Sequence, residues 1–182
     1  MSDRTPGIRP RASLWRRLDI AARHAFPTAS TLALMLLVTA PFGLPDQAAL
    51  LPAVALACVF FWSLFRPTAM APPFVFVIGL LLDLLGNLPL GVGILALLMA
   101  HGVVMQTRRI LVRQGFMLVW GGFLCVAALV ALLVWITSAL LTFQLLPFGP
   151  AAFQFVLSGA LYPLLTVLFM QAHRGIADPE QA

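Results

Sequence analysis

The arginines of this chain fall in alternate gaps between its long apolar segments, and the chain contains no lysine. A helix needs about 20 apolar residues to cross the hydrocarbon core of a bilayer, and most of the segments are close to that length. The sequence therefore predicts an all-α polytopic membrane protein with six transmembrane helices. The expected segments are residues 27–44, 48–65, 70–86, 88–107, 116–142 and 150–173.

The third and fourth segments are separated only by a short stretch that contains glycine and proline. The residues from Gly86 to Gly91 are typical of a tight connection between antiparallel helices. A single helix across this stretch would place the cluster of basic residues from Arg108 to Arg113 outside the cell, against the usual charge rule. Two helices are therefore predicted here.

The distribution of arginine also predicts the orientation of the helices. Arginine occurs before the first segment, after the second, after the fourth and after the sixth, and the other connections have none. Because short basic connections stay in the cytoplasm, both termini are expected there, in a bacterial inner membrane. The basic residues expected on this side include Arg16, Arg17, Arg66, Arg108, Arg109 and Arg113.

Three parts of the chain follow from this pattern. Residues 1–26 are an arginine-rich cytoplasmic arm, residues 27–173 are the six-helix transmembrane domain, and residues 174–182 are a short cytoplasmic tail. Apolar residues recur at helical spacing between Ser13 and Ala25, as in a short helix at the membrane interface. A disordered basic tail that only orients the first helix is the alternative.

The composition agrees with a membrane protein. Apolar residues make up 62% of the chain, charged residues make up 9%, and the mean hydropathy is +1.01. The net charge of +5 comes from arginines beside the apolar segments, which favours contact with anionic membrane lipid. Nucleic acid is not expected as a partner.

Residues that could support catalysis or metal binding are few and scattered. The histidines and cysteines show none of the short spacings of metal sites, and no phosphate-binding glycine loop is present in the sequence. The sequence predicts no catalytic residue, no metal ligand and no cofactor. His101 is expected to form a hydrogen bond with a neighbouring helix.

Asp83 is an acidic residue inside a predicted transmembrane helix. A buried acidic group costs about 2.5 to 3.5 kcal/mol at the centre of such a helix, and the dipole at the C-terminal end of its own helix disfavours it further. One interpretation is a bracing role, with bonds to Asn87 or to free backbone amides at the start of the next helix. The other is a proton or substrate site. No basic partner lies in the outer half of any predicted segment, so bracing is favoured.

Two faces rich in small or polar residues are predicted to pack against each other. Gly79 and Gly86 share a helical face with Asp83 and would let another helix approach closely. In the last segment, polar side chains recur every fourth residue, and Pro163 leaves a backbone carbonyl free near Gly159. The residues of this polar stripe are Gln154, Ser158, Tyr162 and Thr166.

The block from Phe74 to Gly91 resembles the signature of the bacterial rod shape-determining protein MreD family. In this block a glycine and an aspartate four residues apart, Gly79 and Asp83, precede a short turn and the pair Leu90-Gly91. Arg66-Pro67 and the run from Ser158 to Pro163 are similar to the family in position. The likeness covers roughly residues 51–174, and the long N-terminal arm departs from the family.

The resemblance implies a non-enzymatic membrane component of the machinery that elongates the cell wall and maintains rod shape. Its implied partners are the bitopic protein MreC, MreB filaments, and the wall synthases RodA and a penicillin-binding transpeptidase. It also implies the architecture of the substrate-binding subunit of energy-coupling-factor transporters. The candidate packing or partner-contact residues are Gly79, Asp83, Gly86, Asn87, Gly91, Gln154, Ser158, Tyr162 and Pro163.

A vitamin-binding subunit of an energy-coupling-factor transporter is the alternative function. Such a protein should carry several polar residues on its outer connections and in an upper cavity. The outer connections here, residues 41–47 and 143–150, offer Asp46, Gln47 and Gln144. This scarcity favours the role in wall elongation.

Overall fold

The computed structural model describes residues 14–40, 49–86, 88–144 and 146–177, and it describes side chains from residue 25 to residue 171 within these ranges. The described chain forms six α-helices and contains no strand, which confirms the predicted all-α class for this part of the protein. The helices are α1 (Leu14–Thr39), α2 (Leu50–Phe65), α3 (Pro72–Leu85), α4 (Val92–Leu111), α5 (Phe116–Thr142) and α6 (Gly149–Ala177).

Among the described residues, three helices are long and apolar enough to cross a membrane. They are α4, α5 and the part of α6 from Gly149 to Gln171. The helices α2 and α3 have 16 and 14 residues, so at about 1.5 Å per residue they measure about 24 and 21 Å. A hydrocarbon core is about 30 Å thick. The prediction of six transmembrane helices therefore stays a prediction.

The predicted break between the third and fourth helices is confirmed. The helix α3 ends at Leu85, and α4 begins at Val92. Gly91 precedes α4 with a φ of +97°, a left-handed conformation that favours glycine. The chain thus turns between two antiparallel helices where the sequence predicts a tight connection.

The first helix begins earlier than the predicted transmembrane segment. From Leu14 onward α1 is helical, so the end of the arm and the start of the apolar segment form one continuous helix. Pro27 lies inside this helix, and the hydroxyls of Ser30 and Thr31 both donate to its carbonyl, at 2.9 and 2.7 Å. The arm is thus helical from residue 14 as the first part of α1 and not as a separate short helix, and its position at the membrane interface stays a prediction.

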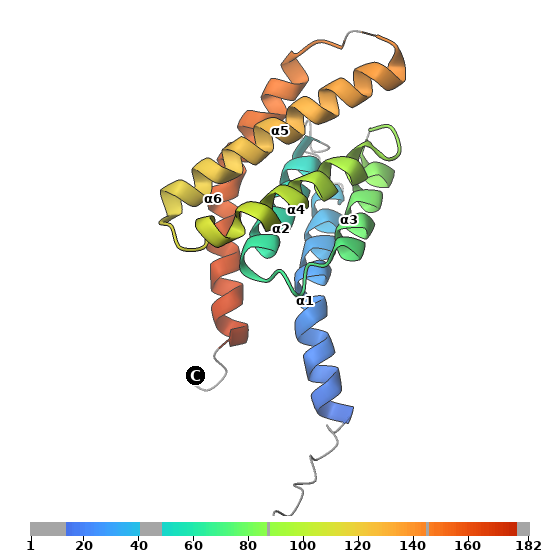
Figure 1. The fold of residues 1–182 in the computed structure, drawn as a ribbon. Coiled ribbons are helices and arrows are strands. Elements are labelled where there is room, and N and C mark those ends of the chain that lie inside the picture. The colour runs from blue at the N-terminus through green and yellow to red at the C-terminus, as the bar shows by residue number, and fades with distance from the viewer. Residues whose placement is uncertain (1–13, 41–48, 87, 145, 178–182) are drawn as a thin grey trace, which may run out of the picture.

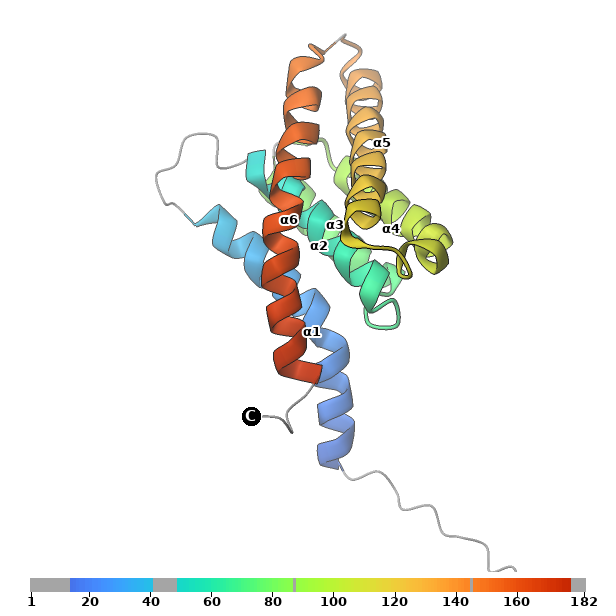
Figure 2. The same cartoon turned by 90° about the vertical axis from the view of Figure 1, so that its left-hand side faces the viewer.

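Four helices form a closed ring, and the other two pack beside it. Each of α2, α4, α5 and α6 packs against the next, and α6 returns to α2. The helix α3 pairs with α4, and α1 packs on α2 and α3. Both the start of α1 and the end of α6 lie at one end of the molecule (Figure 1). We call this the proximal end, and we call the opposite end, where α5 finishes and α6 begins, the distal end (Figure 2).

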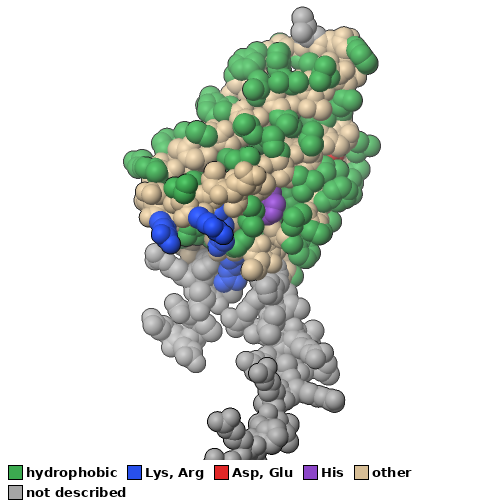
Figure 3. All heavy atoms as spheres, in the orientation of Figure 1, with side chains coloured by type: hydrophobic (Ala, Val, Ile, Leu, Met, Phe, Trp, Pro, Cys, Tyr) green, Lys and Arg blue, Asp and Glu red, His purple; other side chains and the backbone are tan. Residues whose placement is uncertain are grey.

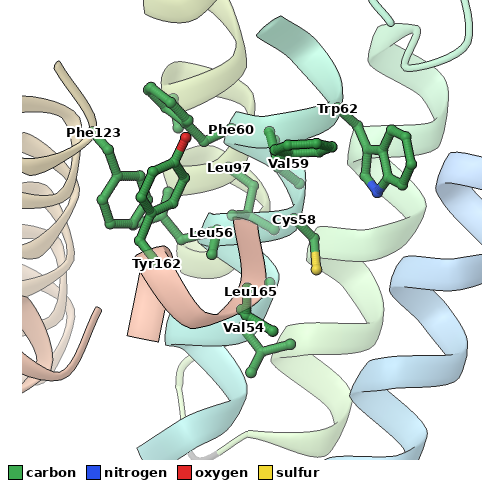
Figure 4. Packing of buried hydrophobic residues seen from close by; sticks show 14 of the residues in the cluster. Val54, Leu56, Cys58, Val59, Phe60, Trp62, Leu97, Phe123, Tyr162 and Leu165 are labelled. Carbon is green, nitrogen blue, oxygen red and sulfur yellow. The ribbon is translucent and has the colours of Figure 1, made fainter. Parts of the chain in front are cut away.

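Three aromatic side chains fill the centre of the ring. The rings of Phe123 on α5 and Tyr162 on α6 stack with centroids 4.2 Å apart, and Phe60 of α2 meets both edge-on at 5.2 and 5.5 Å (Figure 4). Such aromatic pairs add about 0.5 to 1.5 kcal/mol each beyond the area that they bury. This aromatic triad joins three of the four ring helices.

The outer surface of the bundle is apolar, as expected for a protein in contact with lipid. Hydrophobic side chains cover most of the face seen in Figure 3, and basic side chains gather at the proximal end. The large exposed hydrophobic residues include Leu84, Leu90, Met117, Leu140, Phe143 and Leu164.

Gly79 lets α3 and α4 approach closely, as the sequence predicts. A Cβ atom at Gly79 would lie 2.6 Å from the Cα atom of Ile94 on α4, which is far inside van der Waals contact. Gly102 of α4 has no heavy atom within 4 Å of the corresponding position. The two glycines therefore offer a matched comparison.

We expect Gly79→Ala to lower the free energy of unfolding by about 1 to 3 kcal/mol, because the added methyl group must push the two backbones apart. Gly102→Ala should leave it unchanged or raise it by up to about 1 kcal/mol, since alanine is the better helix former. Unfolding in mixed micelles, followed by circular dichroism, measures both. Equal behaviour of the two variants would contradict the close contact.

Candidate functional site

The carboxylate of Asp83 is held by the first backbone amides of α4. Oδ1 accepts from the Gly93 amide at 2.7 Å, and Oδ2 accepts from the Gly91 amide at 2.8 Å and from the Ile94 amide at 3.4 Å. The residue is 4% exposed. Free amides at a helix N-terminus are unpaired donors, and the helix dipole favours negative charge there. The bracing role that the sequence favours is thus the arrangement observed, with α4 as the partner.

The antiparallel pairing of α3 and α4 explains how the buried charge of Asp83 is compensated. Asp83 lies near the C-terminal end of its own helix, where the dipole is unfavourable. The N-terminus of α4 lies beside it because the chain reverses direction between the two helices. Asn87, the other predicted partner, lies outside the described residues.

Two glycines make room for the carboxylate. Gly91 adopts the left-handed conformation before α4, and Gly93 passes so close that a Cβ atom there would collide with Oδ1 of Asp83. Gly91 was predicted as a residue of this site from the sequence, and Gly93 was not. The short spacing between the two glycines at the start of a helix was the available signal.

Gly86 ends α3 in an extended conformation, with φ of −90° and ψ of 175°. Its amide donates to the Leu82 carbonyl at 2.8 Å, and a Cβ atom would lie 2.7 Å from that same carbonyl oxygen. Gly86 therefore serves the turn at the end of α3. The prediction that Gly86 lets another helix approach closely is therefore wrong.

The predicted contact between the Asp83 face and the Gln154 stripe is wrong. Asp83 faces α4, whereas Gln154 of α6 faces the start of α2. With its amide oriented to satisfy both atoms, Gln154 donates to the Ala49 carbonyl at 3.1 Å and accepts from the Ala53 amide at 3.0 Å. The spacing of a polar stripe shows which residues share a face, but the neighbouring helix depends on how the whole bundle packs.

The remaining polar residues of α6 bond within their own helix or enter the core. Ser158 donates to the Gln154 carbonyl and Thr166 donates to the Tyr162 carbonyl, both at 2.8 Å. The ring of Tyr162 belongs to the aromatic triad. The hydroxyls of Ser158 and Thr166 are thus satisfied within α6, whereas the buried Tyr162 hydroxyl has no hydrogen bond to a described residue.

The carbonyl left free by Pro163 has a specific partner. Proline has no amide hydrogen, so the carbonyl of Gly159, four residues earlier, loses its usual donor. The indole Nε1 of Trp120 on α5 donates to this carbonyl at 3.1 Å. The free carbonyl is as predicted, and it ties α6 to α5.

The described arginines gather at the proximal end. Arg66 follows α2, Arg108 and Arg109 lie in the last turn of α4, and Arg113 lies in the connection to α5; basic side chains gather at this end in Figure 3. The guanidinium Nε of Arg108 donates to the Leu64 carbonyl at 2.9 Å, so it caps the last turn of α2. The side chains of Arg16 and Arg17 lie outside the described part of the chain.

His101 bonds a neighbouring helix, as predicted. Its Nδ1 lies 2.8 Å from the hydroxyl oxygen of Ser63 on α2, and both side chains are buried. Within the described residues, no group of three or more His, Cys, Asp or Glu side chains comes together. The contact joins α4 to α2.

A cavity of about 300 Å³ lies inside the ring of four helices, toward the distal end. Its walls are mostly apolar and come mainly from α2, α4, α5 and α6, with Leu82 of α3 and Leu88 of the α3–α4 connection beside them. Gln154 and Ser158 line it from α6, and Ser138 lines it from α5. Gly93, which holds the Asp83 carboxylate on one side, forms part of the cavity wall as well.

The fold defines an all-helical protein in which some helices are long enough to cross a membrane. In the site, side chains and backbone groups of different helices bond at the helix ends. Comparisons with models of known families, with curated proteins and with solved structures give no match to this chain.

We expect Asp83→Asn to lower the free energy of unfolding by about 1 to 3 kcal/mol, because the new amide group would point a donor at a backbone donor. Asp83→Ala should cost more, since it leaves several amides unpaired. Gln106→Ala, at an exposed position of α4, is the control and should change the value by less than about 0.5 kcal/mol. Full stability of both Asp83 variants would argue against the capping role.

Proposed function

We propose that this chain is a non-enzymatic, multi-pass protein of the bacterial inner membrane that serves the cell-wall elongation machinery and maintains rod shape. In this role it is a scaffold for an MreC-like bitopic protein and, directly or through it, for MreB filaments, RodA and a penicillin-binding transpeptidase. The proposal begins from the resemblance to the MreD family that the block from Phe74 to Gly91 carries.

The proposal is supported by the contacts that the residues of this block make. Its acidic residue, Asp83, is engaged by backbone amides of α4 through both carboxylate oxygens, and Gly79 sets the contact between α3 and α4. The distinctive residues of the block thus build a rigid helix pair. This supports a scaffold, because an enzyme would need its acidic group available to a substrate.

The proposed topology has six transmembrane helices with both termini in the cytoplasm. It is supported by the gathering of Arg66, Arg108, Arg109 and Arg113 at the proximal end, which matches the usual cytoplasmic enrichment of basic residues. The short helices α2 and α3 would be accommodated by local thinning of the bilayer or by their connections.

Two glutamines provide a matched test of this topology. Gln114, after α4, is predicted to lie in the cytoplasm, and Gln144, after α5, is predicted to lie outside; both are exposed. In a variant that lacks Cys58 and Cys125, we expect Gln144→Cys to react with a membrane-impermeant maleimide in intact cells. Gln114→Cys should react only after permeabilisation. The reverse pattern would invert the topology.

Cell shape tests the proposed role directly. Depletion of the protein in its rod-shaped host should produce wide, rounded cells, and expression of the wild type should restore rods, as measured by microscopy. Expression of the Gly102→Ala variant should restore rods equally well, since there is open space around Gly102. Unchanged cell width after complete depletion would contradict the role in elongation.

A vitamin-binding subunit of an energy-coupling-factor transporter is the second candidate, and the distal cavity of about 300 Å³ is the observation in its favour. Pockets for small molecules measure about 300 to 1,000 Å³ and combine apolar walls with a few polar groups. Cells that keep their shape on depletion but require an added vitamin would support this function instead.

A further inference from the structure

The distal cavity has the shape of a channel along one face of α5. Its lining residues on this helix run from Ala127 to Ser138, a distance of about 16 Å at 1.5 Å per residue. One leaflet of a hydrocarbon core is about 15 Å deep, half of the total thickness. The cavity is therefore about as long as a single leaflet is deep.

The inner end of the channel is closed by the aromatic triad. Phe60, Phe123 and Tyr162 each lie four residues, or about one turn, further toward the proximal end than a lining residue on the same helix. The three lining residues are Leu56, Ala127 and Ser158. At this level the three aromatic side chains lie together between the helices, with Phe123 and Tyr162 stacked (Figure 4).

One polar group in the lining has no partner. Ser138 is 6% exposed, and its hydroxyl has no hydrogen bond to any described residue. Nearby hydroxyls behave differently, since Thr142 and Ser158 each donate to the carbonyl four residues earlier. The amide of Gln154 is engaged by α2, and the indole of Trp135 donates to the Leu146 carbonyl at 3.1 Å. The Ser138 hydroxyl oxygen is itself fully enclosed by its neighbours, so the surface that the cavity offers to a ligand is almost entirely apolar.

The position of Ser138 fits the boundary between lipid chains and headgroups. It lies four residues, or about 6 Å, before the end of α5. Trp135 lies beside it in the lining, and tryptophan is enriched at the membrane interface. A carbonyl placed at Ser138 would therefore lie at the depth of a lipid ester, with its hydrocarbon chain pointing toward Ala127.

We propose that the distal cavity binds one acyl chain of a membrane phospholipid, held by its apolar walls. This inference requires the proposed membrane insertion, but it does not depend on the role in wall elongation. Apolar walls match an acyl chain, whereas a polar vitamin would leave most of its own polar groups unpaired.

A phospholipid with a diazirine near the end of one acyl chain tests the proposal in nanodiscs. Leu56 of α2 is 3% exposed and faces the cavity, so only a chain inside the ring can label it. Leu132 of α5 is 49% exposed and reports contact with the surrounding lipid. We expect photolabelling of both α2 and α5 in the wild type.

Two variants of α5 provide a matched pair. Ala131→Phe would fill the cavity, and Ala128→Phe places the same side chain on the exposed face. We expect the first to reduce labelling of α2 at least fivefold and the second to change it by less than twofold.

Labelling confined to α5 in the wild type would overturn the proposal, as would equal labelling of α2 in all variants. Absence of labelling on both helices would contradict membrane insertion itself. Neither result depends on cell shape, so failure of the lipid site and failure of the proposed elongation role can be told apart.

Discussion

The bond between the Asp83 carboxylate and the first amides of α4 is the interaction on which the packing of this bundle depends. It closes the α3–α4 pair at the distal end, and Gly79 lets α3 approach the first turn of α4 closely at Ile94. The position of α4 then sets its other contacts. His101 reaches Ser63, and Arg108 reaches the last turn of α2. The contact between α3 and α4 thus fixes the position of α4 in the ring.

Other helix ends also have free backbone groups that need hydrogen-bond partners. In a bilayer, water cannot satisfy free backbone groups, so protein groups must do so. Side chains from other helices meet this need here. Gln154 bonds the first turn of α2, Arg108 bonds its last turn, and Trp120 bonds the carbonyl that Pro163 leaves free. Each bond joins two helices as well as completing one, so the polar residues of the described bundle act mainly as connectors. This pattern fits a scaffold.

Local features of the fold could be predicted from the sequence, and partners between helices could not. The turn from Gly86 to Gly91, the free carbonyl near Gly159 and the bracing role of Asp83 follow from properties of single residues and were predicted. The partner of Gln154 was predicted wrongly because periodicity gives a face but not its neighbour. Gly93 was missed because the carboxylate beside it belongs to another helix, and its short spacing from Gly91 was the only local signal. The cavity also went unpredicted, because it results from small side chains on several helices.

Hydrogen exchange at the start of α4 tests the central role of Asp83 most directly. In the wild type, the amides of Gly91 and Gly93 should exchange slowly, because both are bonded to the carboxylate. In Asp83→Ala, nuclear magnetic resonance in micelles should show exchange at these two amides at least about tenfold faster, a change of about 1.4 kcal/mol, with Val104 in the middle of α4 affected less. Unchanged exchange at Gly91 and Gly93 would contradict the account.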